Sequence, residues 1–75
     1  MTDDLAKAIR VDSVGQEYAI VAATPCACGG RWRVIRQALV QHAGRFGDRL
    51  EVTCAQCGAT GVFLFDISAF FGAPL

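Results

Sequence analysis

The sequence predicts a small, mainly β domain that a bound metal ion stabilises. Two close pairs of cysteines, Cys26 with Cys28 and Cys54 with Cys57, frame 25 intervening residues. Between and after these pairs, apolar residues alternate with other residues in the manner typical of strands. A chain of 75 residues has room for one domain, and chains of this length commonly need a metal or a disulfide to fold.

We separate an N-terminal lead-in, residues 1–15, from the predicted metal-binding domain, residues 16–75. Residues 2–13 are candidates for a short helix, because Thr2 is a suitable N-cap and Asp3 and Asp4 favour the positive end of a helix dipole. The apolar spacing does not continue beyond Ile9, so a strand and a flexible segment stay open as alternatives. Residues 13–16 read as a turn around Gly15.

Three or four antiparallel strands follow from the alternation, over residues 18–24, 31–41, 49–53 and 60–67. Residues 42–48 contain two glycines and predict the hairpin loop between the second and third of these strands. Strict alternation along 31–41 places Arg36 on the opposite face from Arg31 and Arg33. Asp66 lies near the end of the last segment, where capping or turn formation explains a lone carboxylate.

The cysteines are the candidate metal ligands, since four thiolates in two close pairs complete a tetrahedron around one soft divalent ion. A glycine follows each pair directly, Gly29 after the first and Gly58 after the second. Glycine tolerates a positive φ, which lets backbone N–H groups point back at the sulfurs. Four protein ligands leave no open coordination position, so the predicted ion has a structural role.

This arrangement resembles the double knuckle of the zinc ribbon, over roughly residues 24–67. The second pair has the ribbon pattern C-x-x-C-G, whereas the first is the shorter C-x-C-G-G. The resemblance implies antiparallel strands around one structural Zn²⁺, bound by Cys26, Cys28, Cys54 and Cys57.

Two other cysteine chemistries compete with zinc. One is a pair of disulfides or a thiol redox pair. The other is iron in a rubredoxin-like site; rubredoxins resemble this cysteine pattern but use two C-x-x-C knuckles, whereas the first pair here is C-x-C. The N-terminus has no cationic region followed by an apolar run, and no apolar stretch reaches about 18 residues. We therefore expect no membrane association and a cytoplasmic location, where thiols stay reduced.

Basic residues gather between residues 31 and 49, where Asp48 is the one acid among them. Because acidic and basic residues balance over the whole chain, nucleic-acid binding is the second candidate function. Its candidate contacts are Arg31, Arg33, Arg36, Arg45 and Arg49. The alternative is a solvated hairpin whose cations offset the negative metal site.

Four of the five phenylalanines, Phe63, Phe65, Phe70 and Phe71, lie near the C-terminus. This cluster either completes the core or forms an apolar patch for a protein partner or a second copy of the chain. No catalytic constellation is visible in the sequence, since phosphate loops and paired acids are missing and His42 is the single histidine. We therefore predict a non-enzymatic interaction module: an adaptor, a small subunit or a regulator.

Overall fold

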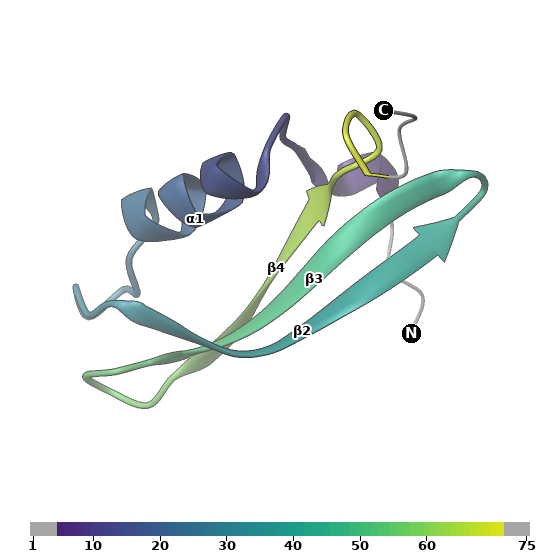
Figure 1. Ribbon diagram of the computed structural model, residues 1–75. Helices are drawn as coiled ribbons and strands as arrows, with labels where there is room; N and C mark the ends of the chain where they lie inside the picture. The colour runs from purple at the N-terminus through teal and green to yellow at the C-terminus, as the bar shows by residue number, and fades with distance from the viewer. Residues whose placement is uncertain (1–4, 72–75) are drawn as a thin grey trace.

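The computed structural model describes residues 5–71, which form a four-stranded sheet with one α-helix across one face (Figure 1). The elements are the 3₁₀ helix η1 (Leu5–Lys7), β1 (Ile9–Arg10), α1 (Val14–Ala23), β2 (Trp32–His42), β3 (Arg45–Cys54) and β4 (Thr60–Asp66). The strand order is β1-β4-β3-β2, with β2, β3 and β4 antiparallel and β1 parallel to β4. The predicted mainly β class is confirmed, and the short parallel strand β1 is an addition to it.

The helix α1 replaces the strand predicted over residues 18–24, and that prediction was wrong. Ser13 is the N-cap, and its hydroxyl accepts a hydrogen bond from the N–H of Gln16 at 3.2 Å. The Gln16 side chain in turn accepts from the N–H of Asp12 at 2.6 Å. Residues 13–16 are thus a capping motif of the S-x-x-Q type, which begins a helix, and not the turn that we predicted. The helix ends before Pro25, as expected for the residue that precedes a proline.

The N-terminal segment reaches both faces of the sheet. Thr2, Asp3 and Asp4, which we proposed as the start of a helix, lie outside the described residues. Leu5 is 3% exposed and packs where Gly47 of β3 leaves room, because a Cβ at Gly47 would collide with the Leu5 side chain. After β1 the chain crosses the sheet edge, and Val11 enters the core beneath α1.

The β2–β3 turn is shorter than the predicted loop over residues 42–48. It consists of Ala43 and Gly44 alone, and both have a positive φ, 51° and 78°. Such two-residue turns match the twist of an antiparallel hairpin. Gly47 suggested a loop, but it lies within β3, where the missing side chain admits Leu5 and Val40.

A β-bulge between Val34 and Arg36 overturns the strict alternation that we predicted for β2. Arg33 pairs with Thr53, and after the bulge Arg36 pairs with Glu51. Thr53 and Glu51 are two residues apart on β3 and share a face. Arg33 and Arg36 therefore lie on the same face of the sheet. The extra residue of the bulge, Ile35, shifts the alternation by one position, so that residues three apart share a face.

The core lies between α1 and the sheet (Figure 1). It consists of Val11, Val21, Leu50, Val52, Phe65 and Ile67. Leu50, Val52 and Phe65 are completely buried. These residues alternate along β3 and β4, so the face of the two central strands beneath α1 is apolar except at Asp48.

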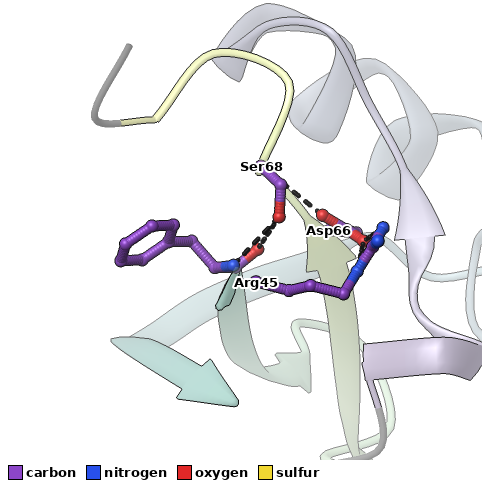
Figure 2. Close-up of polar contacts among 4 residues, drawn as sticks. Arg45, Asp66 and Ser68 are labelled. Atoms are coloured by element: carbon purple, nitrogen blue, oxygen red, sulfur yellow. Dashed lines mark hydrogen bonds and ion pairs between the residues drawn. The ribbon is translucent and has the colours of Figure 1, made fainter. Parts of the chain in front are cut away.

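Asp66 connects the end of β4 to the start of β3 and to the turn that follows (Figure 2). Its Oδ1 accepts from the N–H of Ser68 at 2.9 Å, and its Oδ2 accepts from the Arg45 guanidinium. The carboxyl is buried, yet the hydrogen bonds from Ser68 and the charge of Arg45 outweigh burial and hold the pKa of Asp66 at about 2. The predicted role in turn formation agrees with this geometry.

We expect Asp66→Asn to lower the free energy of unfolding of the metal-loaded protein by about 1–3 kcal/mol, because it removes a charged acceptor from buried hydrogen bonds. Urea denaturation at pH 7 measures this change. The matched control is Glu51→Gln, which alters a partly exposed ion pair and should cost less than about 1 kcal/mol. Equal effects of the two substitutions would contradict the assignment.

Candidate metal centre

The two cysteine-containing turns lie together at one end of the sheet (Figure 1). The first joins α1 to β2, and the second joins β3 to β4. The register of the sheet brings them together, because Trp32 at the start of β2 pairs with Cys54 at the end of β3. The turns are also connected directly, since the N–H of Ala55 donates to the carbonyl of Arg31 at 2.9 Å.

The first turn is closed by its own backbone. The N–H of Gly29 donates to the carbonyl of Cys26 at 2.7 Å, and the N–H of Cys26 donates to the carbonyl of Gly30 at 3.1 Å. Gly29 has a φ of 86°, the positive value expected from its place after the cysteine pair. The N–H of Gly30 lies 3.3 Å from the sulfur of Cys28, so it can stabilise a thiolate there.

The second turn presents its backbone to Cys54. The N–H groups of Gln56 and Cys57 each lie 3.4 Å from the Cys54 sulfur. Gly58 has a φ of 78°, and its N–H donates to the carbonyl of Cys54 at 3.0 Å. These are the N–H to sulfur contacts that orient the ligands of a metal-bound knuckle.

The four sulfur atoms all lie within 4.8 Å of one another. Two of these distances are 3.5 Å, between Cys28 and Cys54, and 3.6 Å, between Cys26 and Cys57. A zinc–sulfur bond of about 2.3 Å implies sulfurs about 3.8 Å apart in a regular tetrahedron. The donor set and its spacing therefore fit one tetrahedral metal ion.

The pKa values of two cysteines at the site favour a thiolate at Cys54 and oppose a second one at Cys28. Hydrogen bonds from the N–H groups of Cys57 and Gln56 lower the pKa of Cys54 to about 6. The N–H of Gly30 also lowers the pKa of Cys28, but hydrogen bonding to the neighbouring thiols raises it to about 12. A divalent cation bound by these sulfurs would remove this opposition, so metal binding at neutral pH would release the proton of Cys28.

Gly30 is a functional residue that we did not single out from the sequence. A Cβ at this position would lie 2.5 Å from the Cys54 sulfur and 2.8 Å from Cβ of Gln56. The second glycine of C-x-C-G-G is therefore needed because the backbone passes directly beside the opposite turn. The doubled glycine is the sequence feature from which this role could have been predicted.

The arginines predicted as nucleic-acid contacts do not form one surface. Arg33, Arg36 and Arg49 share the sheet face opposite α1. There Glu51 forms ion pairs with Arg49 at 3.1 Å and with Arg36 at 3.8 Å. Arg45 pairs with the buried Asp66. Arg31 lines a separate cavity on the α1 side.

The phenylalanines predicted as an interface differ in their exposure. Phe65 is completely buried, and Phe63 and Phe70 are half-buried against the core. Phe71 is 39% exposed and lies beside Phe46, with ring centroids 5.0 Å apart. Three of the four thus take part in packing, and Phe71 is the exposed member.

Trp32 packs between the metal site and the core. Its indole N–H donates to the carbonyl of Thr24 at 2.7 Å, and its ring meets Phe63 edge-on at 6.4 Å. His42 is exposed at the other end of β2, where it is the cross-strand neighbour of Arg45. Because the cysteines lie at the start of β2 and His42 at its end, His42 is too far from the four sulfurs to bind the same metal ion in this fold.

Comparisons with protein-family models, curated proteins and solved structures gave no match to this chain. The likeness to zinc ribbons therefore depends on the cysteine motif and its geometry. What these show is two cysteine-containing turns whose four sulfurs lie within metal-binding distance of one another.

We expect Gly30→Ala to weaken metal binding at least tenfold, because the added methyl group displaces the Cys54 sulfur. Competition with a chromophoric chelator measures the affinity. Gly15→Ala is the matched control, since the nearest atom to its new Cβ is Ser13 Oγ at 3.9 Å and alanine favours a helix. Unchanged affinity in Gly30→Ala would show that the turns need no such close approach.

Proposed function

We propose that the chain is a non-enzymatic interaction module built around one structural Zn²⁺. The observation that carries the proposal is the closed set of four cysteine sulfurs within 4.8 Å. Zinc is the commonest ion in tetrahedral four-cysteine sites, and its coordination would be complete without water or substrate. When bound, the ion would supply charge and cross-linking, while the turn N–H groups would orient the sulfurs.

The structural role agrees with the size of the core. Six side chains form the buried cluster, and only three of them are completely inaccessible. Structural zinc contributes about 10–16 kcal/mol of apparent binding free energy in small domains. We therefore propose that folding and metal binding are one equilibrium, and that the protein works where thiols stay reduced, in the cytoplasm.

The partner proposed here is another protein. Large apolar side chains remain exposed on α1, β2 and the C-terminal turn: Val14, Tyr18, Val34, Ile35, Leu39 and Phe71. Exposed apolar area of this kind is typical of interaction surfaces. None of the described helices is long and apolar enough to cross a membrane.

Removing the metal tests the structural role. We expect a chelator to abolish the β-sheet circular dichroism, and one equivalent of Zn²⁺ to restore it under reducing conditions. Elemental analysis of the same sample should give one zinc per chain and no iron. A chelated protein with an unchanged thermal melt would contradict the proposal, and a red protein containing iron would support the rubredoxin-like alternative.

Nucleic-acid binding remains the second candidate because the β-bulge aligns Arg33 and Arg36 on one face with Arg49. Against it, Glu51 lies within ion-pair distance of both Arg36 and Arg49 and offsets part of their charge.

We expect fluorescence anisotropy to show no salt-dependent binding of single-stranded or duplex DNA or RNA at near-physiological salt. The comparison variant replaces Arg33, Arg36 and Arg49 with Gln. Binding by the natural chain that is lost in this variant would overturn the protein-partner proposal in favour of nucleic acid.

A further inference from the structure

Two buried carboxyl groups face each other beneath α1, away from the cysteines. Glu17 of α1 is 1% exposed and Asp48 of β3 is 5% exposed. The amide of Gln37 on β2 donates to Asp48 Oδ2 at 2.9 Å. Glu17 Oε1 has no hydrogen-bond partner, which is rare and costly for a buried carboxyl oxygen.

No cation of the described chain neutralises these acids. Asp66 and Glu51 take part in the ion pairs of the described residues, whereas Glu17 and Asp48 do not. The arginines in those pairs come from the opposite side of the sheet or from the hairpin end. Asp48, joined by Glu17 whenever Glu17 is ionised, therefore gives this site a negative potential that no cation among the described residues offsets.

Glu17, Gln37 and Asp48 line a cavity of about 380 Å³. Its other walls are apolar, with Leu39 from β2 and Phe70 and Phe71 from the C-terminal turn. Leu39 is 56% exposed and Phe71 is 39% exposed, so both form its rim. A small number of polar groups that converge in an otherwise apolar cavity is typical of ligand-binding sites.

We propose that this cavity binds a guanidinium group carried on an aliphatic chain. A guanidinium is planar, always charged and weakly hydrated, and it donates in pairs to carboxylates. The aliphatic stem would pack against Leu39 and Phe70, and the exposed aromatic ring of Phe71 at the rim would attract the cation. The group is either an arginine side chain of a partner protein or a free alkylguanidine.

Binding at this site displaces a proton. Burial, hydrogen bonding with Asp48 and the charge of Asp48 raise the pKa of Glu17 to about 8, so Glu17 is protonated at neutral pH. Glu17 and Asp48 are the titratable groups that line the cavity. The guanidinium replaces the proton of Glu17, which leaves to solvent, and no other bond changes.

The test titrates n-butylguanidinium into zinc-loaded protein and follows the backbone amides by NMR. We expect saturable shifts at Gln37, Leu39, Asp48 and Phe71, with binding at least tenfold tighter than that of neutral n-butylurea. From pH 6 to pH 8 the affinity should rise by up to about tenfold per pH unit, and above pH 8 it should level off. Equal binding of the urea, or affinity independent of pH, overturns the proposal.

Single substitutions test whether the buried carboxyl groups are responsible for n-butylguanidinium binding. Glu17→Gln should weaken n-butylguanidinium binding at least tenfold at pH 8, whereas Glu51→Gln, on the other face of the sheet, should leave it unchanged. If Glu17→Gln does not fold, the pH dependence of n-butylguanidinium affinity in the natural chain is sufficient to test the proposal. Shifts confined to the cavity lined by Tyr18 and Arg31 would also overturn the proposal.

A second arm distinguishes the sources of the ligand. A blocked Ala-Arg-Ala peptide is compared with its citrulline counterpart and with n-butylguanidinium. Tighter binding of the arginine peptide than of n-butylguanidinium identifies a protein ligand, and the reverse order identifies a small molecule. Failure of both probes overturns this site without affecting the zinc proposal, because the protein is zinc-loaded throughout.

Discussion

The convergence of four cysteine sulfurs is the constraint on which the rest of this structure depends. Two turns, separated by the whole β2–β3 hairpin, meet so closely that one of them must contain glycine at position 30. The N–H groups around Cys54 favour its thiolate, but a second negative charge beside it is unfavourable without a cation. A divalent ion bound by the four sulfurs would resolve this conflict and would join the turns between α1 and β2 and between β3 and β4 at a single point.

The sheet extends beyond the helix that covers it. Val21 of α1 packs on Leu50, Val52 and Phe65 of the central strands, while the edge strand β2 keeps Val34 and Leu39 exposed. This geometry leaves two cavities between α1 and β2, one beside the metal turns and one beside Glu17. Zinc would thus fix the frame, and the uncovered strip along β2 would be the surface available to partners.

The sequence predicted those features that depend on local chemistry. Cysteine spacing and the following glycines specify a knuckle regardless of its surroundings, and the sulfur cluster agrees with that prediction. Alternation over residues 60–67 and 31–41 placed β4 and most of β2 correctly. The period of two survives in β4 because Phe63 and Phe65, on one face of that strand, contact the core, whereas most side chains of β2 are exposed.

Some of the errors arose where a distant contact decides the local structure. The strand predicted over residues 18–24 was a local error instead, because alanine favours a helix and the capping motif at Ser13 was present in the sequence. Gly47 belongs to a strand because Leu5 packs against it, and the bulge at Ile35 is set by the pairing with β3. The contact between Glu17 and Asp48 joins residues far apart in the chain, so no local pattern predicts it.

The central claim is that one ion is bound by four cysteine sulfurs and by nothing else. X-ray absorption at the zinc edge of the freshly purified, reduced protein measures this coordination directly. We expect four sulfur neighbours at about 2.3 Å from the zinc and no directly bound nitrogen or oxygen. A first shell that includes nitrogen or oxygen, or a protein without zinc whose cysteines are joined as disulfides, would contradict it.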